Sequence, residues 1–187
     1  MAGEFWNNAN VEPKRTHRFL VEFELPNNTT ALMYARSVTK PGYEVGQSEL
    51  KFLGQSYYYP GAVSWSDVSV SLVNSASPDF DEKLQALLVS SGYVNPDQVS
   101  TSPNSIDDAG TISKAGAVGT LGRVLIKELD GDGGTLGHYV LNNAWVRSVA
   151  YSGLDYGSEE LSTVDLTFRY DWATYSTGDE SLYSNVV

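Results

Sequence analysis

Apolar and polar side chains alternate with a period of two residues along most of this chain. The pattern is clearest in residues 17–25, where Phe19, Val21 and Phe23 share one side and charged residues share the other. Such alternation is typical of a half-buried β-strand. The same pattern predicts further strands in residues 31–38, 63–73, 123–129, 138–150 and 161–172. The chain is therefore predicted to be mainly β.

A long hairpin is predicted in residues 43–59. Its first strand alternates up to Gly54-Gln55, and residues 56–59 return as a tyrosine-rich second strand. Pro60-Gly61 is interpreted as a corner that leads into the next strand. A hairpin this long, with few charges, leaves strand edges that favour pairing with another chain. The pattern thus indicates assembly rather than catalysis.

One helix is predicted to follow the strand that ends near residue 73. Ser77 is placed as its N-cap, Pro78 suits the first helical position, and Gly92 ends it. A lone amphipathic helix is expected to cover one face of a β-structure. Residues 94–118 are rich in Ser, Asn, Asp and Gly and are predicted to be a surface insertion without elements. The apolar stripe of the helix consists of Phe80, Leu84, Leu87 and Leu88.

These elements predict a mainly β fold in which two antiparallel sheets pack orthogonally as a sandwich or small barrel. One α-helix flanks the sheets and the long hairpin protrudes. The 187 residues suffice for a single domain that spans residues 1–187. We expect residues 1–15 to form an N-terminal arm and residues 173–187 to form a C-terminal tail.

The composition narrows the function further. The 12 Lys and Arg residues face 23 Asp and Glu residues, which gives a formal charge of -11. Such a chain has no electrostatic attraction for nucleic acid phosphates. There is no cysteine, and thus no disulfide framework. The N-terminus lacks a secretory signal pattern and no apolar segment has the length of a membrane span, so we expect a soluble protein made in the cytoplasm.

No motif in the sequence supplies catalytic or metal chemistry. Residues 130–134 resemble the start of a calcium loop, but the fifth, sixth and twelfth positions carry the wrong side chains, so we predict a hairpin turn. His17 and His138 have no Cys or carboxylate cluster with them. The sequence predicts no enzyme, no cofactor and no metal site. Flexible backbone rather than a phosphate loop is predicted at Gly116, Gly119 and Gly122.

The order of segments resembles the tail tube protein of contractile-tailed bacteriophages (myoviruses). The resemblance covers residues 16–93 and 121–172. It rests on the first strand, the Lys40-Pro41-Gly42 corner, the hairpin that ends at residues 57–61, the strand in 65–74, the helix and the closing strand in 166–172. This fold family also includes the tube proteins of type VI secretion and R-type bacteriocins.

The resemblance implies a structural virion protein. Proteins of this family form hexameric rings that stack into the inner tail tube. Four strands of each subunit join a barrel of about 24 strands around a lumen. The resemblance implies the tail sheath protein, the baseplate and the tail terminator as partners, and genomic DNA that passes through an acidic lumen into the host without specific binding. The tube would be assembled in the host cytoplasm.

Two sets of residues are candidates for these roles, and each has an alternative. Subunit contacts could instead be packing within one chain, and lumen acids could instead be ordinary surface charges. The predicted interface residues are Leu50, Phe52, Tyr57, Tyr59, Phe5 and Trp6. The predicted lumen-lining acids are Glu44, Glu49, Asp165 and Asp171.

Three other functions remain open from the sequence. The chain could be the tube protein of a related contractile injection system, such as type VI secretion or an R-type bacteriocin. It could be a baseplate protein that carries the first ring. A monomeric β-sandwich that binds carbohydrate is the third, because 12 tyrosines and four tryptophans could stack on sugars.

Overall fold

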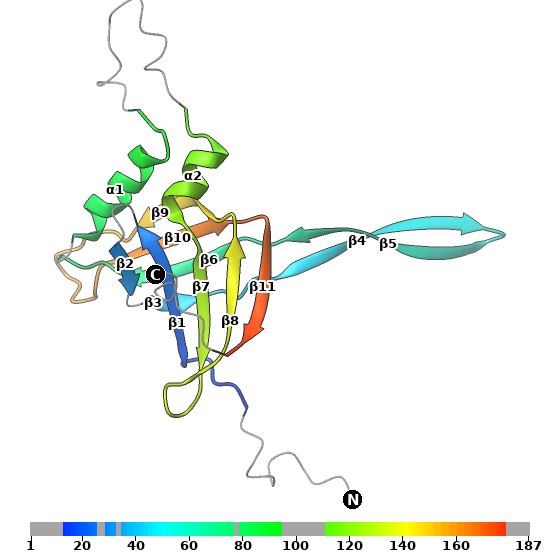
Figure 1. Ribbon diagram of the computed structural model, residues 1–187, viewed down its shortest axis with the longest axis horizontal. Coiled ribbons are helices and arrows are strands. Elements are labelled where there is room, and N and C mark those ends of the chain that lie inside the picture. Colours follow the sequence, from blue (N-terminus) through cyan, green and yellow to red (C-terminus); the bar gives the residue numbers. More distant parts are fainter. Residues whose placement is uncertain (1–12, 26–28, 33–34, 77–78, 95–110, 179–187) are drawn as a thin grey trace, which may run out of the picture.

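The computed structural model describes residues 13–25, 29–32, 35–76, 79–94 and 111–178. Within these residues the chain forms eleven strands and two helices, and all strand pairs are antiparallel. The strands form a five-stranded sheet, a four-stranded sheet and a separate hairpin (Figure 1). This confirms the predicted mainly β fold with a protruding hairpin.

The five-stranded sheet has the order β11-β8-β7-β1-β2 and the four-stranded sheet has the order β3-β6-β10-β9. The strands of the five-stranded sheet are β1 (Phe19–Leu25), β2 (Thr29–Leu32), β7 (Val124–Leu129), β8 (Thr135–Asn142) and β11 (Trp172–Thr177). Those of the four-stranded sheet are β3 (Ala35–Val38), β6 (Val68–Val73), β9 (Trp145–Tyr151) and β10 (Thr163–Arg169). The hairpin and helices are β4 (Tyr43–Phe52), β5 (Gln55–Trp65), α1 (Phe80–Ser90) and α2 (Lys114–Leu121).

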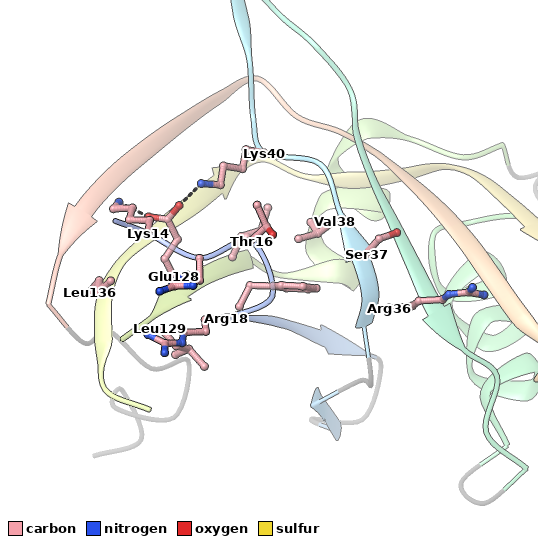
Figure 2. Close-up of a pocket in the computed structure, with 13 residues that line it drawn as sticks. Lys14, Thr16, Arg18, Arg36, Ser37, Val38, Lys40, Glu128, Leu129 and Leu136 are labelled. Carbon is pink, nitrogen blue, oxygen red and sulfur yellow. Dashed lines mark hydrogen bonds and ion pairs between the residues drawn. The ribbon is translucent and has the colours of Figure 1, made fainter. Parts of the chain in front are cut away.

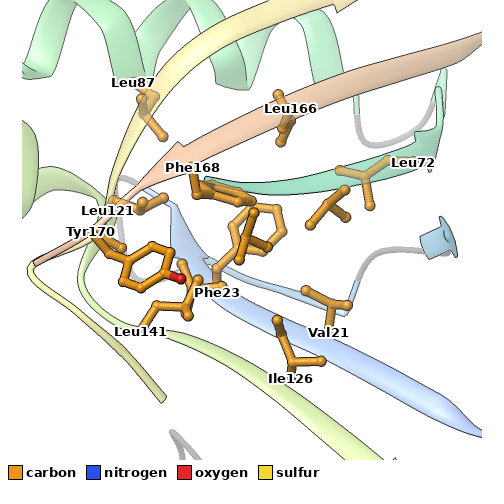
Figure 3. Close-up of a cluster of buried hydrophobic side chains, with 14 of the residues drawn as sticks. Val21, Phe23, Leu72, Leu87, Leu121, Ile126, Leu141, Leu166, Phe168 and Tyr170 are labelled. Carbon is orange, nitrogen blue, oxygen red and sulfur yellow. The ribbon is translucent and has the colours of Figure 1, made fainter. Parts of the chain in front are cut away.

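The core lies between the two larger sheets, as in a β-sandwich. Phe23 of β1 and Phe168 of β10 are fully buried, and their ring centroids lie 5.7 Å apart (Figure 3). Figure 1 shows the strands of one sheet crossing those of the other, with α1 and α2 together at one end of the sandwich. The core side chains from the strands and helices include Val21, Val70, Leu72, Leu84, Leu121, Ile126, Leu141 and Leu166.

Three predicted strands are in fact divided between the two sheets. Residues 31–38, 138–150 and 161–172 each leave one sheet and enter the other. The alternation continues across these changes because both sheets turn their apolar face toward the same core. The turn between β8 and β9 is visible in the backbone, where Asn143 has a φ of 54°.

The predicted C-terminal tail is also wrong in its first part. Residues 172–177 form β11, an edge strand that pairs with β8 along its whole length. Pairing with β8 satisfies backbone groups that a free tail would expose to water. Tyr175 lies directly opposite Tyr139, and the two rings are 4.8 Å apart.

The hairpin is longer than predicted. Pro60-Gly61 is not a corner, because β5 runs through it to Trp65. The ladder has an irregularity between Val45 and Gln47, at the level of Gly46 and Gly61. A Cβ on Gly61 would lie 3.1 Å from the carbonyl oxygen of Gly46, so the two backbones need glycine to approach this closely. The Pro-Gly pair therefore marks a bulge.

The helices also differ from the prediction. Asp79, rather than Ser77, caps α1 by accepting hydrogen bonds from the amides of Asp81 and Glu82; Ser77 and Pro78 lie outside the described residues. The predicted insertion in 94–118 carries most of α2. Gly116 lets α2 approach α1, because a Cβ there would lie 2.8 Å from the carbonyl oxygen of Ser91. Gly116 thus serves helix packing, whereas a Cβ on Gly119 would meet open space and Gly122 is the C-cap of α2 with a φ of 69°.

The turn in residues 130–134 is confirmed as a hairpin turn. The Asp130 amide donates to the carbonyl of Gly134 (2.8 Å), and the Asp130 carboxylate accepts from the amides of Asp132 (2.9 Å) and Gly134 (2.7 Å). An aspartate whose carboxylate accepts a bond from the amide two residues further on is a common turn device. The Asp130 carboxylate therefore stabilises the turn through hydrogen bonds to its backbone.

Candidate assembly surfaces

The predicted interface side chains lie together on one face of the hairpin. The ladder places Leu50 opposite Tyr57, with Tyr59 and Phe52 two residues further along each strand. All four are exposed: Leu50 54%, Phe52 62%, Tyr57 47% and Tyr59 54%. None of the four belongs to the buried core formed by the described residues. We call them the hairpin face.

The hairpin also exposes its backbone edges. Within the described residues, β4 pairs only with β5, and β5 only with β4. Each strand therefore has a second edge of N–H and C=O groups that no other strand of the described residues covers. Such an edge accepts a strand from another molecule by backbone hydrogen bonding.

The tip of the hairpin is formed by a leucine in an unfavourable backbone conformation. Leu53 has a φ of 49° and Gly54 a φ of 79°, the signs that a two-residue type I′ turn requires. Asn-Gly is the usual pair there, and leucine in the left-handed region costs about 1–2 kcal/mol. Leu53 is 87% exposed, so its side chain gains little from contacts with the described part of the chain that would offset this cost. The sequence predicted a break at Gly54-Gln55, one residue later than the turn at Leu53-Gly54, and gave no signal for Leu53.

The hairpin is fixed to the sandwich by charged and aromatic contacts at its base. Arg169 donates to the carbonyl oxygen of Trp65 and to Asp67, both at 2.9 Å, and Arg147 also pairs with Asp67. The hydrogen bond from Arg169, aided by that from Arg147, lowers the pKa of Asp67 despite an opposing effect of burial. The Trp65 ring lies between the rings of Tyr43 (5.4 Å) and Tyr170 (6.0 Å). These contacts set the direction in which the hairpin leaves the domain.

The second candidate surface is the outer face of the four-stranded sheet. Asp165 in β10 lies between Ser71 of β6 and Ala150 of β9, and Thr167 lies between Ser69 and Ser148. This face is exposed or half-buried, and its centre is built from short side chains, while Arg169 lies at the same outward register at the end of β10. The sheet edges, β3 and β9, have no further strand partner in the described part of the chain. The face comprises Ser37, Ser69, Ser71, Ser148, Ala150, Asp165 and Thr167.

The four predicted lumen acids are not gathered on one surface. Asp165 is on the outer face of the four-stranded sheet, whereas Glu44 and Glu49 are on β4 of the hairpin. Glu49 accepts a hydrogen bond from Ser56 (2.5 Å) and lies 3.8 Å from the ammonium of Lys51. The predicted tail contacts Phe5 and Trp6 lie outside the described residues.

Asp171 is held by partners of its own chain. Lys114 at the start of α2 donates to both carboxylate oxygens (2.8 and 2.7 Å), and Asn143 donates at 2.8 Å. The hydrogen bond from Lys114 is the main reason that the pKa of Asp171 lies below its usual range. This acid therefore joins α2 to the turn between β10 and β11, and sequence alone did not reveal the partner.

A buried carboxylate joins the chain segment before β1 to the base of the hairpin. Glu128 of β7 is 6% exposed and pairs with Lys14, which precedes β1, and with Lys40, which precedes β4 (Figure 2). Lys14 also donates to the hydroxyl of Tyr175 (3.0 Å). Glu128, Lys14 and Lys40 border a pocket of 260 Å³ that is lined by five of the chain's 12 basic side chains. Burial opposes ionisation of Glu128, but the two lysine hydrogen bonds outweigh it and lower its pKa.

Replacing Glu128 with Gln is expected to cost about 1–2 kcal/mol of folding free energy at neutral pH, because two charge-assisted hydrogen bonds are lost while both lysines remain solvated. Since folding lowers the pKa of Glu128, its contribution is present at neutral pH and fades as the pH falls through the lowered value. Urea unfolding at pH 7 and in acid checks this. An unchanged difference between wild type and Glu128→Gln at both pH values would contradict it.

Two kinds of site are not found in the described residues. No group of three or more His, Asp or Glu side chains there could hold a metal ion. None of the helices in those residues has the length and apolar character that crossing a membrane would take.

The fold is shared with chains of contractile injection assemblies. A chain in the cryo-EM structure of an extracellular contractile injection system, the PVC sheath–tube complex in its extended state, is 14% identical with a TM-score of 0.59, and the match covers 88% of this chain and 92% of that one. A chain in the PVC sheath/tube terminator structure is 16% identical with a TM-score of 0.58, covering 90% and 100%. A chain in the anti-feeding prophage baseplate structure is 16% identical with a TM-score of 0.57, covering 89% and 97%.

No protein-family model and no curated protein matches the sequence. The likeness to known proteins therefore rests on the fold alone. The chain has the tail-tube fold that the resemblance to contractile-tail tube proteins predicted, over nine-tenths of its length in the PVC terminator comparison.

Proposed function

We propose that this chain is a structural subunit of a tail tube, in which rings of identical copies stack around a central channel. One observation carries the proposal: a four-stranded sheet with two free edges and a polar outer face continues into an exposed hairpin. Within the described residues, the sheet edges β3 and β9 and the outer edges of β4 and β5 make four uncovered strand edges, which are a hazard in a monomer and can be paired in a closed ring. The chain then needs no catalytic group.

Strand direction supports closure of such a ring. In the order β3-β6-β10-β9 every neighbouring pair is antiparallel, so β9 runs opposite to β3. If β9 of one copy lies beside β3 of the next, the new pair is antiparallel as well, and the alternation continues around the ring. Six copies would give a barrel of about 24 strands, which is wide enough to leave an open channel.

The polar face of the four-stranded sheet suits the channel wall. Its short side chains offer little for a passing molecule to adhere to, and Asp165 adds negative charge that repels phosphate. We propose that Glu44 and Glu49 extend this charge along the hairpin, while Asp171 is the weakest lumen candidate because Lys114 and Asn143 bind it.

In the phage form of this proposal, the tube carries genomic DNA and the chain is a virion protein of a contractile tail. Its partners are the sheath, the baseplate and the tail terminator. The tail would be assembled in the host cytoplasm. The overall charge of -11 supports passage of DNA without binding. The three structures compared above are of a sheath–tube complex, a sheath/tube terminator and a baseplate. A tube that carries protein cargo is the alternative.

Sedimentation velocity over a wide range of concentrations tests the proposal. The expected result is a monomer at low concentration and species of six chains or multiples of six as the concentration rises. A chain that stays monomeric at the highest attainable concentration, including after addition of preformed baseplate, would contradict the tube proposal and favour the monomeric carbohydrate-binding module.

A further inference from the structure

We propose that residues 179–187 lie across the outer face of the five-stranded sheet of their own chain and cover it as a strap. The outer face is the side of this sheet that is turned away from the core. Five of its side chains are buried, and we call them the covered strip: Glu22, Leu125, Lys127, His138 and Val140. The inference concerns the single chain and does not depend on tube assembly.

The strand ladders place the covered strip on three neighbouring strands. Leu125 of β7 lies opposite Glu22 of β1 and Val140 of β8, and Lys127 of β7 lies opposite His138 of β8. Side chains that lie opposite each other in a ladder point to the same face of the sheet. The alternate positions of the same strands belong to the core, so the covered strip points away from the core.

The covered strip is buried although no described helix or strand lies over it. Leu125 is 0% exposed and Val140 is 5% exposed, yet neither belongs to the core between the sheets. The two helices lie together at one end of the sandwich, and the four-stranded sheet packs on the opposite face (Figure 1). The outer face of that other sheet is different, because Ser69 and Asp165 at its centre are exposed. A leucine on an outer face loses all contact with water only when another segment packs against it.

The end of β11 brings the chain to the covered strip. β11 ends at Thr177, and the carbonyl oxygen of Gly178 lies 3.2 Å from Nδ1 of His138. Residues 179–187 therefore begin beside a member of the strip. Nine extended residues span about 30 Å and neighbouring strands are about 4.8 Å apart, so the segment is long enough to cross from β8 over β7 to β1.

The order of side chains in residues 179–187 matches the chemistry of the covered strip. Two acids, Asp179 and Glu180, come first, at the end of the strip that holds Lys127. Apolar side chains follow in the segment, and the apolar members of the strip lie next along β7 and β8. Attraction between opposite charges and burial of apolar surface both favour this order. The apolar side chains of the segment are Leu182, Tyr183, Val186 and Val187.

The N-terminal end of the described chain lies on the other side of the sheet. Lys14 donates a hydrogen bond to the hydroxyl of Tyr175 (3.0 Å). Tyr175 lies opposite Tyr139, whose side chain packs against the core, so both point to the core side. Gly178, by contrast, contacts His138 on the outer side. This difference favours the C-terminal segment over the N-terminal segment as the occupant.

The strap has a consequence for association between copies. An uncovered strip would offer Leu125 and Val140 as an apolar surface on which copies could associate without order. With the strap in place, the four-stranded sheet is the larger sheet whose outer face stays open to neighbours in the described residues. The strap thereby restricts ordered contacts to that sheet.

Labelling of a single cysteine tests the strap, because the chain has no cysteine of its own. The thiol of Val140→Cys should react with a maleimide about tenfold or more faster when Leu182→Asp and Tyr183→Asp are added, because two new charges detach the strap and exposure limits the reaction. Leu141→Cys points into the core and should react slowly with or without these changes. The rates are measured in dilute solution, where the protein is monomeric.

The matched control changes the N-terminal segment in the same way. Phe5→Asp with Trp6→Asp should leave the labelling rate of Val140→Cys as in wild type. A rate that is unchanged by Leu182→Asp with Tyr183→Asp would overturn the strap. A rate that rises only with the N-terminal pair would also overturn it and would identify residues 1–12 as the cover.

Cross-linking tests the same contact without disturbing the strap. Thr174 of β11 is exposed and lies opposite Val140, so it points to the outer face beside the strip. In Thr174→Cys with Tyr183→Cys, a short bismaleimide should join the two thiols within one chain, as measured by mass spectrometry. Ala150→Cys with Tyr183→Cys should give no such link, because Ala150 lies on the outer face of the other sheet. Links only between chains, or equal links from both pairs, would overturn the proposal, whereas ring formation is tested separately by sedimentation.

Discussion

Replacing residues 48–59 with Asn-Gly is expected to abolish tube assembly while the sandwich stays folded. Gln47 and Pro60 are partners in the ladder, so a two-residue turn can join them. The removed residues are exposed along both strands and contribute nothing to the buried core. The melting temperature, measured by circular dichroism, should change by only a few degrees or less, because surface changes generally have small effects on stability. Sedimentation velocity should show no species larger than one ring.

A paired set of point variants separates the hairpin face from hairpin length. Leu50→Thr with Tyr57→Thr removes two exposed apolar side chains from the hairpin face, and should weaken assembly by about a hundredfold or more if both are buried in a neighbour. Gln47→Thr with Lys51→Thr changes the same strand without removing any large apolar side chain, and should assemble nearly as wild type. Tubes formed normally by the shortened chain would show that the hairpin takes no part in assembly.

Lys127→Met is expected to destabilise the folded chain by about 3–5 kcal/mol. Lys127 of β7 and Glu22 of β1 form an ion pair of 3.0 Å, and both side chains are almost completely buried. Removing the lysine leaves the Glu22 carboxylate buried without its ion-pair partner. One of its oxygens, Oε2, already has no hydrogen-bond partner in the described residues. Urea unfolding at a concentration where the protein is monomeric measures the loss.

The double variant Glu22→Leu with Lys127→Met shows whether the loss comes from an unpaired charge. Replacing both members of a buried pair with apolar side chains is often close to neutral, so the double variant should recover most of the stability. Lys51→Met is the matched surface control and should change stability by about 0.5 kcal/mol or less, because Lys51 is largely exposed. A double variant as unstable as Lys127→Met would contradict the account.

Strand positions followed closely from the alternation, but sheet membership did not. Phe19–Leu25 and Val124–Leu129 match their predicted strands almost residue for residue. Residues 138–150 were predicted as one strand, because alternation records only which side faces the core and both sheets share that core. Backbone breaks such as the positive φ of Asn143 depend on tertiary contacts, which sequence periodicity does not contain.

For the candidate surfaces as well, local features could be predicted from the sequence, whereas features that depend on the fold could not. Leu50, Phe52, Tyr57 and Tyr59 were found because an apolar row on a long hairpin is a local property, and the structure places all four on one exposed face. The covered strip of the five-stranded sheet was missed, because Glu22 and Lys127 look like ordinary surface charges until the fold buries them. The partner of Asp171 was missed for a similar reason, since Lys114 is 57 residues away in sequence.

Electron microscopy of the purified, concentrated protein tests the tube account most directly. The account predicts hollow rings with six-fold symmetry that stack into rods, with the four-stranded sheet lining the channel in averaged images. Rods without a channel, or particles no larger than one chain at every concentration, would contradict it.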